Sequence, residues 1–305
     1  MRILLKVGMY LENKNLSRAD KKIKALESKY RVGEEGGLRT KYTKHAFFRL
    51  YRFILDADRT PIGEDGVILK MADVGLYLLL NFMAEDISPK DGAKIAILNS
   101  EHIKMLIKEL LNKTRTDSSS SNRVKESFYR LEKLGLIKCN IRQTARTTFY
   151  EDITIPFKND QLNSREGFFR FPNFDMHTLL TNIKNGGRKF GVKEFLELLG
   201  VYAVACLTFY KEYNEKTDKS EIPLKNGIVT VSTMASTRYA NRIDFTFGLK
   251  LTGSVRKKGI QEYMDILEEL GVIVSTSIRE NGIKFVIYTF PRNFGQLKTV
   301  IRHLY

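Results

Sequence analysis

Apolar residues at helical spacing, followed by apolar residues at alternate positions, form the first of two similar series along the chain. A buried helix is predicted over 74–83, after Asp73, and a second over 100–110, where Ser100 is the expected N-cap. A third helix follows the serine run 118–121, which offers further capping hydroxyls. It ends at Gly135, a residue that tolerates the positive φ of a helix C-cap.

Beyond Gly135 the apolar period changes to two. The segments 136–141 and 147–155 are rich in Ile, Thr, Phe and Tyr, which favours two antiparallel strands. The turn between them carries Arg142 and Arg146. The first series therefore predicts three helices followed by a β-hairpin.

The second series repeats this order. Helices are predicted over 195–210, 233–239 and 255–270. Ser254 is a candidate cap for the last helix, and Gly271 ends it. Strands are then predicted over 272–278 and 283–290. Asn281-Gly282, between these strands, is the strongest short signal for a two-residue type I′ turn.

Four short matches between the series indicate an internal duplication. Their offsets run from 121 to 136: Phe47-Phe48-Arg49 with Phe168-Phe169-Arg170, Gly75-Leu76-Tyr77 with Gly200-Val201-Tyr202, Thr154-Ile155-Pro156 with Thr289-Phe290-Pro291, and 131–137 with 267–273. Their order is kept, and the offsets drift as loop insertions would make them. The expected fold class is α+β, mainly α, with two winged-helix domains (helix-turn-helix plus hairpin wing) in tandem. The phenylalanines of the first match are expected to be core anchors.

The domain division follows from these series. We expect a basic N-terminal arm or linker at 1–40, winged-helix domain 1 at 41–158, a linker at 159–166 and winged-helix domain 2 at 167–305. The arm contains a basic helical stretch around 19–30. A cut within the linker should give two separately folded halves.

Charge narrows the class of partner. The chain has 51 Lys and Arg against 35 Asp and Glu, a net charge of +16 with a pI near 9.6. Such a field concentrates polyanions, although a solvated basic surface or an acidic membrane would also satisfy it. No apolar run reaches about 18 residues, and no basic amphipathic helix carries Trp or Phe on its apolar side. Nucleic acid is the favoured partner, no membrane is expected, and the expected location is cytoplasmic.

The residues that commonly carry enzyme chemistry are scattered. Cys139 and Cys206 lie in separate apolar stretches, as expected for reduced core residues, and no zinc site is implied. The sequence has no P-loop motif and no His-hydrophobe-His motif, and its four histidines are isolated. We expect no catalytic residues, no metal, no cofactor and no enzyme activity.

Candidate DNA contacts lie on the third helices and the wings, because in this fold the last helix enters the major groove and the hairpin reaches the backbone or minor groove. The first third helix offers Ser121, Asn122, Arg123, Lys125, Tyr129 and Arg130. The second offers Ser254, Arg256, Lys257, Lys258 and Gln261, and the wings supply Arg142, Arg146, Arg279 and Lys284.

The residue types on these elements suit particular parts of DNA. Arg and Lys suit guanine edges or phosphates, and Asn and Gln suit adenine. Arg123 and Arg256 lie near helix starts and are expected to read bases. Arg146 and Arg279 are expected to meet phosphate or the minor groove. The serines cap the helices or bind phosphate.

Two basic winged-helix domains in tandem, related by internal pseudo-symmetry, resemble the replication initiators of theta-replicating plasmids and some phages. The resemblance covers about residues 41–305 and is carried by the Leu-Glu-[Lys/Glu]-Leu-Gly-[Leu/Val]-Ile matches and the wing hairpins. It implies binding to double-stranded DNA at repeated origin sites, homodimer and monomer forms, autoregulation, and recruitment of the host helicase or its loader. The long basic start and the Ser-rich helix entry depart from the better-known initiators.

Two other functions fit the same architecture. One is a transcriptional or transfer-operon regulator of a mobile element. The other is a replisome adaptor whose winged helices contact proteins, although an adaptor does not need basic character on both third helices. Direct repeats beside the gene would separate an initiator from a regulator.

Overall fold

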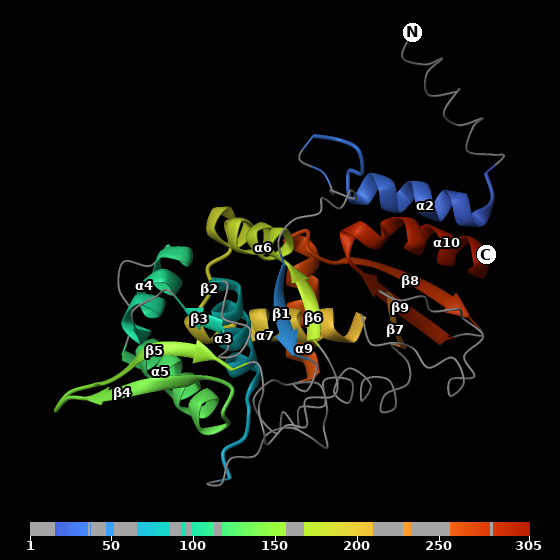
Figure 1. Ribbon diagram of the computed structural model, residues 1–305. Coiled ribbons are helices and arrows are strands. Elements are labelled where there is room, and N and C mark those ends of the chain that lie inside the picture. Colours follow the sequence, from blue (N-terminus) through green and yellow to red (C-terminus); the bar gives the residue numbers. More distant parts are fainter. Residues whose placement is uncertain are drawn as a thin grey trace. The chain divides into compact units, whose positions relative to one another are not determined.

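The computed structural model describes residues 16–35, 37, 47–51, 66–85, 93–95, 99–112, 118–156, 168–209, 228–232, 257–280 and 283–305 (Figure 1). Over these residues the fold is mixed α+β and mainly helical, as predicted, with small sheets. It divides into two compact units. One, called the α3/α7 unit after helices α3 (Met71–Met83) and α7 (Val192–Phe209), holds the described residues of 45–210 and 235–272. The other, called the α2/α10 unit after helices α2 (Arg18–Lys29) and α10 (Phe294–Leu304), holds those of 1–44, 211–234 and 273–305.

The α3/α7 unit is built around a close contact between its two most apolar helices, α3 (Met71–Met83) and α7 (Val192–Phe209). A Cβ atom on Gly75 would lie 1.8 Å from the carbonyl oxygen of Leu196, and one on Gly200 would lie 2.1 Å from that of Met71. At the predicted repeat offset of 125, Met71 aligns with Leu196 and Gly75 aligns with Gly200. The two contacts therefore join the same two aligned positions, backbone against backbone.

A two-stranded sheet joins two segments that the sequence matched. Strands β1 (Phe47–Tyr51) and β6 (Phe168–Pro172) pair antiparallel, and Arg49 lies opposite Arg170, its predicted match at offset 121. Phe48 is buried, as predicted, and stacks on Phe171 with ring centroids 4.8 Å apart. Phe171 in turn contacts Tyr202 of α7 edge to face. The side chains of Phe47, Phe168 and Phe169 lie outside the described part.

The rest of the first series also lies in this unit. Helices α4 (Ser100–Leu110) and α5 (Ser118–Lys133) and strands β4 (Lys138–Gln143) and β5 (Thr148–Ile155) confirm the predicted helices and hairpin. Two short strands, β2 (Ala84–Glu85) and β3 (Ala93–Ile95), were not predicted, and the sheet order is β2-β3-β5-β4. Gly135, with φ of 65°, follows α5 as expected.

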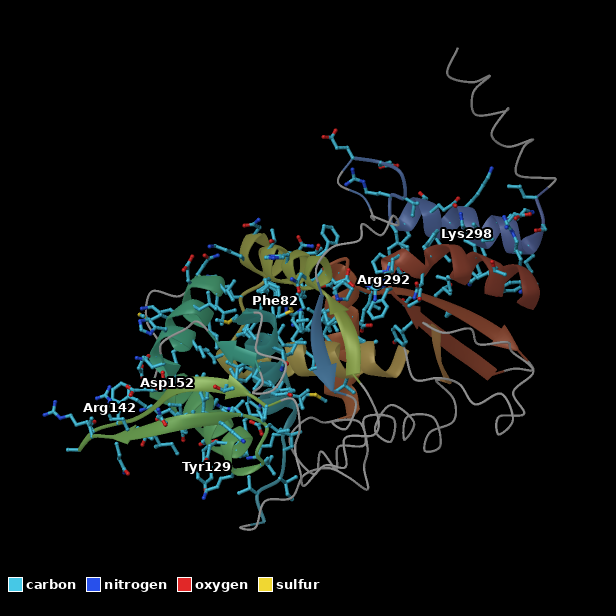
Figure 2. The ribbon with its side chains drawn as sticks, in the orientation of Figure 1. Phe82, Tyr129, Arg142, Asp152, Arg292 and Lys298 are labelled. Carbon is cyan, nitrogen blue, oxygen red and sulfur yellow. The ribbon has the colours of Figure 1, made fainter. Side chains whose placement is uncertain are left out.

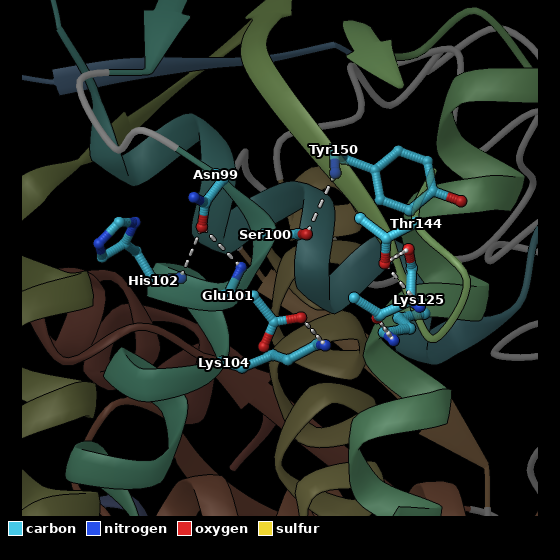
Figure 3. Close-up of polar contacts among 9 residues, drawn as sticks. Asn99, Ser100, Glu101, His102, Lys104, Lys125, Thr144 and Tyr150 are labelled. Atoms are coloured by element: carbon cyan, nitrogen blue, oxygen red, sulfur yellow. Dashed lines mark hydrogen bonds and ion pairs between the residues drawn. The ribbon is translucent and has the colours of Figure 1, made fainter. Parts of the chain in front are cut away.

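Capping differs from the prediction. Asn99, not Ser100, caps α4, since its Oδ1 accepts hydrogen bonds from the N–H groups of Glu101 and His102 (Figure 3). Ser100 is the first residue of α4, and its hydroxyl accepts the N–H of Tyr150 in β5. Asp73 lies inside α3 and accepts the N–H of Lys70. The serine run 118–121 forms the first turn of α5 rather than preceding it.

Helices α6 (Asn173–Asn185) and α9 (Lys257–Glu269) complete the α3/α7 unit. The amide of Asn182 in α6 donates to the carbonyl of Leu270, which follows α9, at 2.8 Å. The hydroxyl of Tyr263 in α9 donates to Glu197 of α7 at 2.7 Å. Helix α9 and the positive φ of Gly271 match the prediction, whereas α6 was not predicted. The predicted helix 233–239, Ser254 and the turn 281–282 lie outside the described residues.

In the α2/α10 unit, strands β7 (Ile228–Ser232), β8 (Val274–Glu280) and β9 (Ile283–Thr289) form a sheet of order β7-β9-β8. The hairpin β8–β9 was predicted. A 3-10 turn, η4 (Pro291–Asn293), leads into α10 (Phe294–Leu304), which packs against α2 (Arg18–Lys29). In the four-stranded sheet β3 pairs with β5 and β5 with β4; in the three-stranded sheet β7 pairs with β9 and β9 with β8.

Within the expected N-terminal arm, the described helix α2 packs into a hydrophobic core. Helix α2 lies where the basic stretch was predicted. Its Ala19, Ile23 and Leu26 are buried in one cluster with side chains of β8 and α10, namely Val274, Phe294, Leu297 and Ile301. The apolar side of α2 is therefore part of the hydrophobic core of this unit.

The predicted linker 159–166 lies outside the described residues, but the elements on either side of it share a core. Helix α3 precedes this segment and α7 follows it, and their contact is the most extensive between any two described elements. The compact units consequently divide the chain along a different line from the expected domains 41–158 and 167–305. This packing favours the two halves folding together rather than separately.

Candidate nucleic-acid interface

Helix α5 and the β4–β5 hairpin hold eight of the predicted DNA-contacting residues in one unit. Phe128 of α5 stacks on Tyr150 of β5, with ring centroids 5.3 Å apart and planes at 15°. The ammonium of Lys125 donates to the hydroxyl of Thr147 at the base of the hairpin turn (Figure 3). An apolar and a polar contact thus connect the helix to the hairpin. Lys125, a predicted DNA contact, therefore also has a partner within the protein.

Arg130 was predicted to contact DNA, but the structure gives it an internal role. Its Nε and Nη2 donate to the two carboxylate oxygens of Asp73 at 2.7 and 2.9 Å, and only 13% of its side chain is exposed. Asp73 is fully buried and also accepts the hydroxyl of Ser127 at 2.6 Å. These bonds fix α5 against α3. The polar face of α5, which the sequence predicted to be exposed, is therefore partly buried against α3.

The start of α5, unlike Arg130, presents side chains to the outside. Asn122 and Arg123 are exposed and make no hydrogen bond or ion pair with any residue the structure describes. Val124, next to them, is buried, so the helix is anchored while these two side chains face outward. Tyr129 is 42% exposed, and the ammonium of Lys133 lies 6.0 Å from the centre of its ring. The side chain of Ser121 is not among those described.

The hairpin turn is held by its own polar groups. The N–H of Thr144 donates to the carbonyl of Thr147 at 2.9 Å, and the N–H of Thr147 donates to the hydroxyl of Thr144 at 3.1 Å. Arg146, in this turn, is exposed and has no ion pair within the described part of the chain. The turn therefore presents one arginine on a rigid backbone.

Arg142 has a partial internal partner. It lies on the outer part of the hairpin (Figure 2), and its guanidinium bonds Glu151 at 2.9 Å and lies 4.4 Å from the centre of the Phe149 ring. Its side chain is still 54% exposed. Arg142 can reach an external anion only by sharing or leaving Glu151, so we rank it behind Arg146.

Sequence reasoning did not single out Lys104 of α4. It is buried and donates to Glu101 at 2.6 Å. Burial lowers the pKa of Lys104, the hydrogen bond and charge of Glu101 oppose that effect, and the nearby charge of Lys125 lowers it further. The sequence analysis predicted α4 from its apolar positions alone, and these positions do not indicate that Lys104 would be buried.

The second series is described less fully. Lys257, Lys258 and Gln261 lie in the first turns of α9, and Arg279 and Lys284 lie directly opposite each other in the β8–β9 ladder. Nothing is described of these five side chains, and Ser254 and Arg256 fall outside the described residues. The two elements belong to different compact units.

Cys139 lies on β4 and Cys206 is buried in α7, and neither forms a disulfide bond. Burial, with a smaller contribution from the charge of Glu132, raises the pKa of Cys139 to about 11. Across the described ranges, no group of three His, Cys, Asp or Glu is placed to hold a metal ion. No described helix is both long and apolar enough to cross a membrane.

Comparison with known proteins adds no assignment, because no family model, curated protein or solved structure matches the chain. The chemistry of the site thus has to be inferred from its residues. Two exposed arginines without partners among the described residues, with an amide beside one of them, can bind an anion or a polar edge. They supply no nucleophile or general base.

Proposed function

We propose that this chain is a non-enzymatic protein that binds double-stranded DNA through two winged-helix folds related by internal duplication. The order of elements supports the fold assignment. In the first series it is helix α3, strands β2 and β3, helices α4 and α5, then strands β4 and β5, with β3 pairing β5. In the second series, β7, β8 and β9 have the same order and pairing. The paired contacts of Gly75 and Gly200 support the duplication.

The observation that carries the DNA assignment is the exposed start of α5. In a helix-turn-helix fold this end of the third helix meets base edges. Here it presents Arg123 and Asn122, side chains that suit guanine and adenine. The hairpin, fixed to the same helix, presents Arg146. We assign base reading to the start of α5 and contact with phosphate or the minor groove to Arg146.

Replication initiation is the particular function we propose. The tandem arrangement and the net charge of +16 support it through the resemblance to plasmid and phage initiators. Direct repeats flanking the chain's own gene are therefore the first DNA to test. Footprinting across those flanks should give protection that recurs with the repeats. Protection confined to a promoter would instead favour a transcriptional regulator.

Once a protected site is known, single alanine variants test the roles of the two arginines. Arg123→Ala should cost about 1–3 kcal/mol on that site and little on random-sequence duplex, because base contacts depend on sequence. Arg146→Ala should weaken both complexes alike if its contact is to phosphate. Affinities are measured by fluorescence anisotropy at one fixed salt concentration.

Lys189→Ala is the matched control. Lys189 is exposed in the loop between α6 and α7, with no ion pair to a described residue, and it lies outside the proposed interface. Its loss should change neither affinity appreciably. If Arg123→Ala weakens the protected site and random duplex equally, α5 does not read sequence and the assignment fails.

A further inference from the structure

The outward side of α2 carries uncompensated positive charge. Between Arg18 and Lys29 the helix has five cations and two acids. Arg18, Lys21 and Lys24 are exposed and lie within two turns of one another. Lys21 and Lys24 make no ion pair with any described residue, and Arg18 lies over the ring of Tyr305, 5.0 Å from its centre. We call these three residues the α2 basic face.

The acids of α2 are paired elsewhere. Glu27 accepts the ammonium of Lys298 at 3.1 Å, and Asp20 lies 3.6 Å from the guanidinium of Arg302. These are the only Lys or Arg residues of α10, whose sequence contains no acid. The acids that could have neutralised the α2 basic face are thus used to hold the two helices together.

Another lysine shows the effect of this crowding. Lys22 turns inward and donates to the carbonyl of Ser277 in β8. Burial lowers the pKa of Lys22, and the charge of Arg18 lowers it further. Repulsion among these cations is a cost that a bound anion would remove.

We propose that the α2 basic face binds the phosphate backbone of duplex DNA, as a second contact beyond the α5 start and the hairpin. The inference rests on the proposed function, because it takes duplex DNA to be the ligand. An anionic membrane is the other polyanionic surface to consider. A membrane-binding helix inserts its apolar face, and that face of α2 is already buried on Ala19, Ile23 and Leu26. Binding to the regularly spaced phosphates of DNA, by contrast, requires only the exposed cations of α2.

The test compares the double variant Lys21→Gln/Lys24→Gln with the unchanged chain on a random-sequence duplex. Each phosphate contact adds about 0.9 to the slope of log K against log salt, so losing two should lower the slope by about 1.8. Preference for a protected site over random duplex should stay the same, because phosphate contacts carry no sequence information. Lys189→Gln, the control, should leave the slope unchanged.

Several results would overturn this inference. A steep slope in the unchanged chain that the double variant retains would remove α2 from the interface while leaving the proposed function intact. If Lys189→Gln lowers the slope by as much as each substitution in the double variant does, the slope depends only on the total charge of the chain and not on α2. Binding to phosphatidylserine vesicles that the double variant abolishes, with DNA binding unaffected, would assign the surface to membranes. An unchanged chain with no affinity for duplex would contradict both proposals.

Discussion

Asp73 connects α3 to α5 through buried hydrogen bonds. It is fully buried and accepts hydrogen bonds from Arg130, Ser127 and the backbone N–H of Lys70. Burial alone would lower the pKa of Arg130, but the hydrogen bonds and charges of Asp73 and Glu126 raise it. Asp73 contributes nothing to the external surface, and Arg130 contributes little. Their effect on DNA binding would act through the position of α5.

Asp73→Ala should therefore destabilise the fold by about 3–5 kcal/mol, because it leaves a largely buried guanidinium with only the exposed Glu126, 3.5 Å away, as a partner. Urea unfolding measures this. Arg130→Met in the same background should recover part of the loss, since the unpaired charge is then gone. Arg142→Ala, which breaks an exposed pair with Glu151, should cost less than about 1 kcal/mol. Equal losses for Asp73→Ala and Arg142→Ala would contradict this account.

Cys139 gives a prediction about pH. Its pKa of about 11, against an ordinary 9.0, means that the neutral thiol persists to higher pH in the folded chain. At pH 8 the thiolate fraction should be about 100-fold below that of an unperturbed thiol, so alkylation by iodoacetamide should be correspondingly slow. The rate should rise as pH approaches 11. Labelling of Cys139 at pH 8 as fast as a denatured control would show that the thiol is not shielded.

For single residues, the sequence predicted which side of a helix each one lies on better than it predicted what each one contacts. Arg123 and Arg130 both lie on the polar side of α5 by periodicity, yet one is exposed and the other bonds Asp73. The difference depends on α3, which lies more than 40 residues away in the chain. Helical periodicity describes one helix at a time and carries no information about the charge that a neighbouring helix presents.

Among the elements, the contact between α3 and α7 depends on two glycines. Ala is ordinarily favoured over Gly inside a helix by about 0.5–1 kcal/mol. At Gly75 and Gly200 a Cβ would instead lie about 2 Å from a backbone carbonyl oxygen of the other helix, which can move only if the helices separate.

Gly75→Ala and Gly200→Ala should each destabilise the chain by about 1–3 kcal/mol or more, through overpacking. Gly295→Ala in α10 is the control. A Cβ there meets nothing within 4 Å, so this variant should be neutral or slightly stabilising. Thermal unfolding compares the three. Stabilisation by Gly75→Ala would mean that the helices are not in close contact.

Elements with a strong period were predicted well, and those defined by pairing were not. Helices α3, α5, α7 and α9 and both hairpins follow from apolar spacing and turn residues. Strands β1, β3, β6 and β7 are three to five residues long, too short to show a period, and each is stabilised by a partner distant in sequence. The match Phe47-Phe48-Arg49 located β1 and β6 but gave no sign that they pair with each other.

Whether the two halves fold together is a property of the whole molecule. The α3–α7 contact and the β1–β6 ladder both join residues from opposite sides of 159–166. Fragments separated at this segment should each lose a buried helical face and fail to melt cooperatively. Mixing them in equal amounts should restore a cooperative melt. Two fragments that each melt cooperatively alone would support independent domains and contradict the shared core.

The central claim, that the chain binds duplex DNA through several phosphate contacts, is tested most directly by the salt dependence of binding. Affinity of the full chain for random-sequence duplex is measured by fluorescence anisotropy over a range of salt concentrations. A net charge of +16 and several exposed cations predict a steep fall of log K with log salt, about 0.9 for each phosphate neutralised. A nearly flat line, or no binding at low salt, would show that these cations do not contact DNA and would contradict the account.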